Sequence, residues 1–444
     1  MNALPDQAGR PTGVFDAHHP PDRALINACV HCGFCLPTCP TYALWGREMD
    51  SPRGRIYLLK LGLQGEIAID DTVAEHFDAC LGCVACVTAC PSGVQYGPLI
   101  EATRGQLERL RKRRLGDRVF RRMVLGLFPN PRRLRAAAIA AWTYQRLRIG
   151  RLLRKTGLFD HLPDQLRALE ELLPAVRLGD LRRRIPIAPV AGSPVMRVGM
   201  VTGCVQAVFF AGVNRATARV LVAEGCEVVI PPAQGCCGAI SSHAGDDAGA
   251  LGRARRMIAA FEEAAVERVV INAAGCGAAL KDYGRWLRDD PDWATRAASF
   301  SARVRDITEL LEELPAHAPR HPIAARAVYA DACHLAHAQG VRSQPRRQLR
   351  AIPDLTVVDI ADGEICCGSA GTYNLVRTEA AEELGRRKVN EILRAGPEVI
   401  VTANPGCALQ IKRHLPSGPG PIPVLHPIEL IDASIRGVRP FPTS

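Results

Sequence analysis

The chain lacks an apolar run long enough to span a membrane. Its longest apolar-looking stretch, from Val198 to Val213, is interrupted by Thr202 and Gln206 and falls short of the roughly 18 to 20 residues that a spanning helix needs. The first 23 residues also lack the basic segment and apolar segment of a secretory signal. We therefore expect a cytoplasmic protein.

The sequence also lacks the common signatures of a catalytic chain. No G-x-G-x-x-G run follows an expected strand, which excludes a Rossmann site for a nicotinamide cofactor or FAD, and no Ser, His and Asp order indicates a triad. His243, His334 and His337 lie near cysteines, but a lone histidine is more often a loop or core residue than a catalyst. We expect no catalytic residue here.

Cysteine, by contrast, is abundant. The 444 residues include 17 cysteines, and in a reducing compartment thiolate ligands for metal are the default explanation. Eight of them repeat the spacing C-x2-C-x2-C-x3-C-P, which is the bacterial ferredoxin pattern, where the fourth cysteine of each run binds the other cluster. The pattern predicts two [4Fe-4S] clusters, one held by Cys29, Cys32, Cys35 and Cys90, the other by Cys80, Cys83, Cys86 and Cys39.

Structural zinc is the alternative for these cysteines, although zinc ribbons usually show paired C-x2-C knuckles. Between the two runs the apolar residues recur at helical intervals, and Ser51 before Pro52 is typical of a helix cap, so we expect a helical ferredoxin domain. Arg53 and Arg55 either tune a cluster or are simply solvated. His31 is interpreted as a filler between ligands.

The segment after the clusters is strongly basic. From Arg104 to Lys155, 17 Lys and Arg stand against Glu108 and Asp117, and apolar residues at helical spacing accompany them. Three interpretations stay open: a solvated arginine face, attraction to anionic lipid or an acidic partner, and binding of a phosphate backbone. No zinc-finger, RRM or helix-turn-helix signature supports the third, so no nucleic acid is expected.

The C-terminal half of the sequence is duplicated. Apolar runs of strand length alternate with helical stretches, and the cysteines of the second copy follow those of the first at offsets of 129 to 131 residues. Each copy predicts a parallel α/β unit with its cysteines at the carboxyl ends of the strands. Candidate further cluster ligands are Cys204, Cys236, Cys237 and Cys276 in the first copy, and Cys333, Cys366, Cys367 and Cys407 in the second. Buried, packed thiols are the alternative, and Cys226, which has no counterpart, is interpreted as an inert core thiol.

These motifs carry a family resemblance. The two copies resemble the CCG domains, which are the cysteine-rich domains of heterodisulfide reductase, and together with CVHCGFCLPTCPTY, SPRGRIYLLK, CCGSAGTYN and NPGCALQIK the whole order resembles the iron-sulfur subunits of bacterial glycolate oxidases. The lactate-utilisation iron-sulfur protein and the iron-sulfur subunit of anaerobic glycerol-3-phosphate dehydrogenase share this architecture. Each copy departs from heterodisulfide reductase by lacking its final C-x-x-C, which argues against disulfide cleavage at twin clusters.

The resemblance implies electron transfer within a complex. FAD lies only on partner subunits, which oxidise glycolate to glyoxylate, and this chain passes the electrons to a membrane quinone or similar acceptor, with peripheral contact at the inner membrane as an option. Lactate and glycerol 3-phosphate are the alternative substrates of the complex. A disulfide reductase and a basic nucleic-acid-binding protein are the alternatives of another class.

The expected fold is α+β and multidomain. The predicted order is a tail (1–20), a helical ferredoxin domain (21–105), a basic amphipathic helical linker (106–190) and two α/β CCG domains (191–316 and 317–444).

Overall fold

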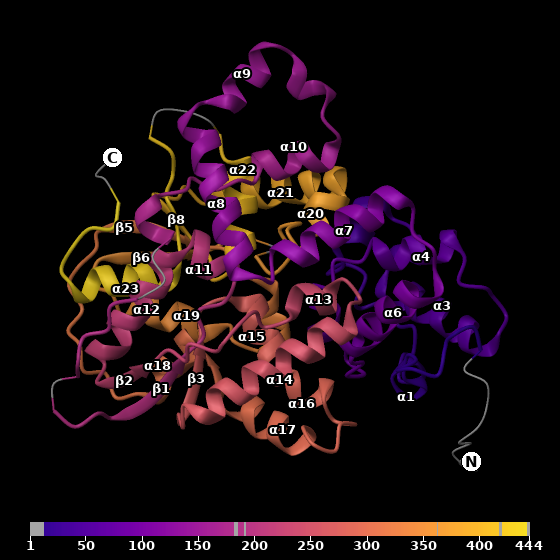
Figure 1. Cartoon of the computed structure of the whole chain (residues 1–444), viewed down its shortest axis with the longest axis horizontal. Helices are drawn as coiled ribbons and strands as arrows, with labels where there is room; N and C mark the ends of the chain where they lie inside the picture. Colours follow the sequence, from indigo (N-terminus) through magenta and orange to yellow (C-terminus); the bar gives the residue numbers. More distant parts are fainter. Residues whose placement is uncertain (1–12, 182–184, 191, 362, 417–419, 442–444) are drawn as a thin grey trace. The chain divides into compact units, whose positions relative to one another are not determined.

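The computed structural model describes residues 13–181, 185–190, 192–361, 363–416 and 420–441 (Figure 1). The chain forms two compact units: unit 1 is Met1–Asp117 with Ser242–Asp247, and unit 2 is Arg118–Ser241 with Ala248–Ser444. None of the helices in the described ranges is both long and apolar enough to cross a bilayer.

Unit 1 is helical, as the spacing of its apolar residues predicted. Ser51 caps the longest helix between the cysteine runs by accepting a hydrogen bond from the Gly54 amide, and Pro52 opens that helix. The apolar core of the unit includes Leu59, Phe77 and Leu99. Its helices are α1 (Arg23–Asn27), α2 (Pro40–Trp45), η1 (Glu48–Asp50), α3 (Pro52–Gln64), α4 (Asp71–Asp78), α5 (Ala85–Thr88) and α6 (Tyr96–Leu110).

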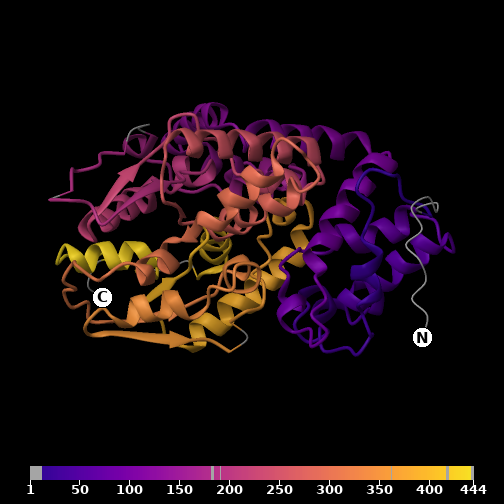
Figure 2. The ribbon, with the colours of Figure 1, turned by 90° about the horizontal axis from the view of Figure 1, so that it is seen from below.

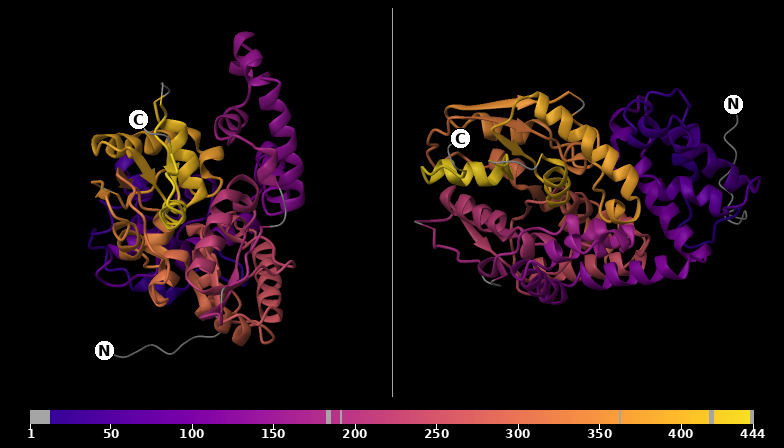
Figure 3. Two further views of the ribbon diagram at one scale, coloured as in Figure 1. Left: turned by 90° about the vertical axis from the view of Figure 1, so that its left-hand side faces the viewer. Right: turned by 90° about the horizontal axis from the view of Figure 1, so that it is seen from above.

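The basic segment that follows is also helical. Asn130 accepts hydrogen bonds from the amides of Arg132 and Arg133 and so caps the helix that begins at Pro131. In Figure 3 these magenta helices extend along and beyond the two sheets of unit 2. The elements are α7 (Leu115–Leu127), α8 (Pro131–Arg146), α9 (Ile149–Lys155), η2 (Leu158–His161), α10 (Asp164–Glu171) and η3 (Leu178–Leu181).

The first half of unit 2 (196–313, apart from Ser242–Asp247, which belong to unit 1) is built on a parallel sheet in the order β2-β1-β3-β4. Val198 and Met200 are fully buried, as expected of a strand covered on both faces. The elements are β1 (Met196–Met200), α11 (Val205–Phe209), α12 (Ala211–Ala223), β2 (Cys226–Val229), α13 (Ala239–His243), α14 (Asp247–Glu263), β3 (Arg268–Ile271), α15 (Ala274–Lys281), α16 (Tyr283–Trp286), α17 (Ala294–Arg303), β4 (Val304–Asp306) and α18 (Ile307–Glu313).

The second half of unit 2 (325–435) repeats this arrangement with a parallel sheet in the order β6-β5-β7-β8. The equal order of the two sheets is what a duplicated sequence predicts. The elements are β5 (Ala325–Tyr329), η4 (His334–Ala338), α19 (Ser343–Arg350), β6 (Leu355–Asp359), α20 (Tyr373–Val376), α21 (Thr378–Arg394), β7 (Val399–Val401), α22 (Pro405–His414), β8 (Val424–Leu425) and α23 (Pro427–Ile435).

The two halves pack against each other. Figure 2 shows the yellow helix α23 of the second half against the magenta first half, where it meets α12. Arg219 of α12 donates to both carboxylate oxygens of Asp432 of α23, at 2.8 and 2.6 Å. The Ala274 amide also donates to the Ala403 carbonyl. This backbone hydrogen bond links the loop before Cys276 in the first half to the loop before Cys407 in the second.

Candidate functional site

The two ferredoxin-type runs adopt the same backbone. His31 and Gly33 have φ angles of 55° and 87°, and Gly82 and Val84, at the matching positions of the second run, have 66° and 52°. A left-handed residue on either side of the second cysteine reverses the chain tightly enough to turn successive thiols to one side. The cost at His31 and Val84 is about 1 kcal/mol each, since neither is glycine.

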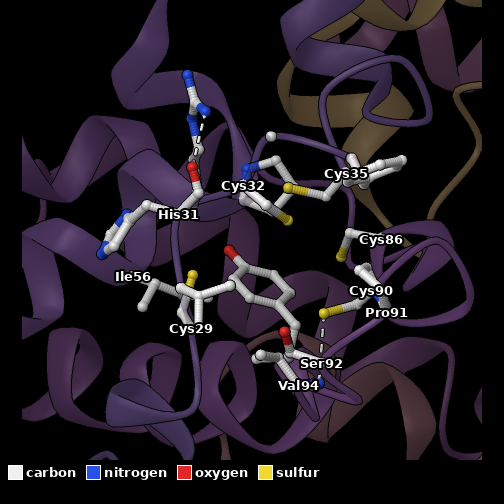
Figure 4. A pocket seen from close by; sticks show the side chains of 16 residues that line it. Cys29, His31, Cys32, Cys35, Ile56, Cys86, Cys90, Pro91, Ser92 and Val94 are labelled. Atoms are coloured by element: carbon white, nitrogen blue, oxygen red, sulfur yellow. Dashed lines mark hydrogen bonds between the residues drawn. The ribbon is translucent and has the colours of Figure 1, made fainter.

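One pocket gathers all four cysteines of the first predicted ligand set. Cys29, Cys32, Cys35 and Cys90 line it, together with Cys86. In Figure 4 the sulfur atoms of these five labelled cysteines face a common space. Cys90 comes from the second run, so the structure brings the fourth cysteine of one run to the first three of the other, as the ferredoxin pattern predicts.

The second predicted set is more deeply placed. Cys39, Cys80 and Cys83 are buried, and Cys39 directly precedes Pro40, the first residue of α2. Burial raises the pKa of the Cys86 thiol well above its usual range, and the nearby Cys83, Cys80 and Cys39 raise it further. The four thiols therefore lie close enough to interact electrostatically.

These thiols suit a cluster better than a single ion. All eight are free thiols, and they stand in two runs of the same spacing. A cluster of four irons and four sulfides is held by four thiolates, and the spacing C-x2-C-x2-C-x3-C-P is the one that bacterial ferredoxins use. The donor set and its repeated spacing thus fit [4Fe-4S] clusters.

A buried arginine lies beside the second set. Arg55 is 1% exposed, and its guanidinium donates to the Thr41 hydroxyl at 3.2 Å and to the His76 carbonyl at 2.6 Å. Burial alone lowers the pKa of Arg55, but the neighbouring Cys80, Tyr96, Cys39 and Asp50 raise it on balance. A fixed positive charge therefore stands next to Cys39 and Cys80.

Arg53, two residues earlier, has a different setting. Its side chain is 28% exposed and pairs with Glu48 at 2.6 Å, while one terminal nitrogen donates to the His31 carbonyl. Of the two arginines, Arg55 is the buried charge and Arg53 braces the first cysteine loop. His31 contributes its backbone to this contact, which agrees with its interpretation as a filler.

The first half of unit 2 gathers its four cysteines at the carboxyl edge of the sheet. Cys204, the Cys236-Cys237 pair and Cys276 follow β1, β2 and β3 respectively. Hydrogen bonds from Cys204 and Cys237 hold the pKa of Cys236 well below its usual range, and the Gly238 amide also points at its sulfur, at 3.5 Å. Cys204, Cys236 and Cys237 therefore lie close enough to affect one another's pKa.

The second half repeats the arrangement after β5, β6 and β7. Hydrogen bonds from Cys366 and Cys407 lower the pKa of Cys367. The pKa of Cys333 is lowered chiefly by a hydrogen bond from Cys366, and also by His334. His334 is therefore a neighbour of this quartet.

The remaining cysteine, two of the histidines near cysteines and two tyrosines have structural settings. Cys226 is fully buried on β2, and burial raises its pKa to about 11, as expected of an inert core thiol. His337 is buried, with Nε2 3.1 Å from the Glu364 carbonyl, and His243 ends α13. Sequence reasoning missed two tyrosines: the Tyr96 hydroxyl is 3.9 Å from the Cys80 sulfur, and the Tyr283 hydroxyl donates to the Cys237 carbonyl. The signal for Tyr96 was its place just after the second run.

Comparison with known proteins adds the family. Residues 25–94 match the 4Fe-4S dicluster domain, 116–173 match the linker region of the glycolate oxidase iron-sulfur subunit, and 198–281 and 327–412 match the cysteine-rich domain. The probable glycolate oxidase iron-sulfur subunit of Bacillus subtilis (strain 168) is 40% identical over 393 residues, which cover 87% of this chain and 88% of that protein. The chain belongs to the family of glycolate oxidase iron-sulfur subunits.

Two further relatives are similar to this chain. The glycolate oxidase iron-sulfur subunit of Escherichia coli (strain K12) is 37% identical over 93% of this chain and 95% of its own. A lactate utilization protein A from an Exiguobacterium species is 29% identical but aligns with only 54% of this chain. The family resemblance and the predicted order of dicluster domain, linker and two cysteine-rich domains are therefore confirmed, and with them an iron-sulfur protein with an electron-transfer role.

Proposed function

We propose that this chain relays electrons from the flavin of partner subunits that oxidise glycolate to a membrane quinone or similar acceptor. In this proposal, one [4Fe-4S] cluster is held by Cys29, Cys32, Cys35 and Cys90, and the other by Cys80, Cys83, Cys86 and Cys39. Bound clusters supply one-electron transfer, which the two-electron oxidation of a hydroxy acid on a flavin requires as its onward path. The observation that supports it best is the pocket where Cys90 joins the first three cysteines.

The protein contributes positions and charge to this function. The left-handed turns hold three thiols on one side, and buried Arg55 offsets the negative charge of thiolates near Cys39 and Cys80. A fixed cation close to a cluster favours its reduced form. We therefore infer that the second site is the one whose potential this charge raises.

The test uses Cys32→Ser in the complex reconstituted with its flavoprotein. We expect the loss of one cluster by iron analysis and EPR, and loss of quinone reduction, while glycolate still reduces the flavin. Cys226→Ala is the matched control, since it removes a buried thiol outside every proposed ligand set. Undiminished quinone reduction by the Cys32→Ser complex contradicts the relay. Thiol production from a disulfide by the isolated chain would favour the reductase alternative.

We also propose peripheral contact with an anionic membrane through α9 and the turn that precedes it (Leu147 and Arg148). Leu147 and Leu152 are 66% and 62% exposed and stand among the exposed Arg148, Arg151 and Lys155. Apolar side chains beside basic ones are typical of interfacial helices. Sedimentation with phosphatidylglycerol vesicles tests it: Leu147→Ser with Leu152→Ser should release the protein, and equal binding by this variant contradicts the contact.

A further inference from the structure

Unit 2 contains a large cleft that the electron-transfer role does not use. Its volume is about 1240 Å³, against roughly 300 to 1,000 Å³ for typical ligand pockets. One wall comes from the end of α7 and the start of α8, and the other from the loops and helices that follow β1 and β2. Cys236 lies on the second wall.

The charge of this cleft has one sign. Six arginines line it, and no Asp or Glu stands among the described lining residues: Arg132, Arg133, Arg135, Arg215, Arg253 and Arg256. Arg215 is neutralised by Asp180 at 2.5 Å. Within the described part of the chain, Arg132, Arg133 and Arg256 form no ion pair. The α8 helix also begins here, so the positive end of its dipole adds to the field.

The cleft is not purely polar. Ile185, Ile187, Ile230, Pro231 and Pro232 line it beside the arginines. Guanidinium groups match phosphate oxygens through paired hydrogen bonds, whereas aliphatic and proline surface accepts a ring or carbon chain. A ligand that satisfies both parts carries phosphate on an organic body.

We propose that this cleft binds an organic phosphate of nucleotide size, with its phosphates on Arg132 and Arg256 and its organic body on the isoleucines and prolines. A concave site of this volume suits an enclosed small molecule better than an acidic peptide lying on a surface. The ligand would lie against Cys236, and therefore beside the cysteine quartet of the first half. The inference goes beyond the electron-transfer role and does not depend on it.

The experiment is isothermal titration of the full chain, with its clusters reconstituted anaerobically, using FMN, ADP and pyrophosphate as probes at one ionic strength. We expect FMN or ADP to bind more tightly than pyrophosphate. Arg132→Gln with Arg256→Gln should weaken binding about ten- to a hundredfold, because two charge-assisted contacts are lost. Both side chains are exposed, so the fold should persist.

The matched control is Arg118→Gln with Arg122→Gln. These exposed arginines belong to the same basic segment but lie outside the described lining of the cleft, so the net charge changes equally. Binding should be little changed in this control. Equal weakening in both double variants means nonspecific attraction and overturns the site. If pyrophosphate binds as tightly as ADP, the proposed contact of an organic body with the isoleucines and prolines is wrong. If a poly-glutamate peptide binds and none of the three probes does, the proposed class of ligand is wrong. The titration measures neither cluster content nor quinone reduction, so a negative result would not bear on the proposed electron relay.

Discussion

The two halves of unit 2 share a fold and differ in what surrounds their cysteines. Both sheets have the same strand order, and both quartets follow the same strands. In the first half Cys236 lines the arginine cleft. In the second half, Lys388 of α21 is only 5% exposed, and its charge helps to lower the pKa of Cys367. The matching part of α14 in the first half buries the apolar Met257 and Ile258 instead. Duplication thus supplies the scaffold, and the loops and helix faces then diverge toward separate roles.

The helix caps diverge in the same way. Asp306 caps α18 after β4, and His426 caps α23 after β8, each in a capping box with a glutamate three residues on. Burial raises the pKa of Asp306 to about 6 and lowers the pKa of His426 to about 3. One structural position therefore carries an acid in one half and a base in the other, both pushed toward the neutral form.

The largest expected effect separates the quartets. Two [4Fe-4S] clusters contain about eight irons, and the wild-type chain should carry more than that. Cys236→Ser with Cys237→Ser should remove only the iron of the first half, and Cys366→Ser with Cys367→Ser only that of the second. Anaerobic iron and sulfide analysis with EPR measures this. About eight irons in wild type and in both variants would mean that unit 2 holds no cluster.

The next effect concerns the base. Because the folded pKa of His426 lies below its ordinary 6.5, its contribution to stability is present above pH 6.5 and is lost as the pH falls toward 3. Between pH 7.5 and pH 5, wild type should lose about 2 kcal/mol relative to His426→Asn, which keeps a cap but does not titrate. Denaturant unfolding at both pH values measures it, and a pH-independent difference would contradict it.

The acid should show the opposite sign and a smaller effect. The folded pKa of Asp306 is above its ordinary 3.8, so its contribution is full below pH 3.8 and is lost as the pH rises through 6. From pH 5 to pH 7.5, wild type should lose about 1 kcal/mol relative to Asp306→Asn. Unfolding of the two variants in parallel tests whether the halves respond oppositely, and responses of one sign would break the comparison.

The smallest expected effect is on the midpoint reduction potential of a cluster in the second half. Lys388→Met removes a buried charge near Cys367 and should lower the midpoint potential of a cluster in the second half by on the order of tens of millivolts. An EPR-monitored redox titration should show every other signal unmoved. A shift in a unit 1 signal instead would place the charge effect elsewhere.

Much of this architecture could be predicted from local patterns. The repeated cysteine spacing, the Ser51-Pro52 helix start and the strand before Cys204 each depend on neighbours in the chain, and the structure has all three. The status of Arg55 could not be predicted, because burial depends on Thr41 and His76, which reach it from other helices. Nor could the place of Cys86, which lines the pocket of the first set while interacting with the second.

The sequence by itself therefore determined the cysteine quartets, the duplication, the family and the basic character of the linker, because spacing and composition are properties of the chain alone. Only the tertiary structure decided that Cys86 also lines the pocket of the first set, which arginine is buried and which arginines face a shared cleft. Those outcomes depend on desolvation and on contacts between residues far apart in the chain, such as Arg132 and Arg256 on one cleft, and no local pattern encodes them.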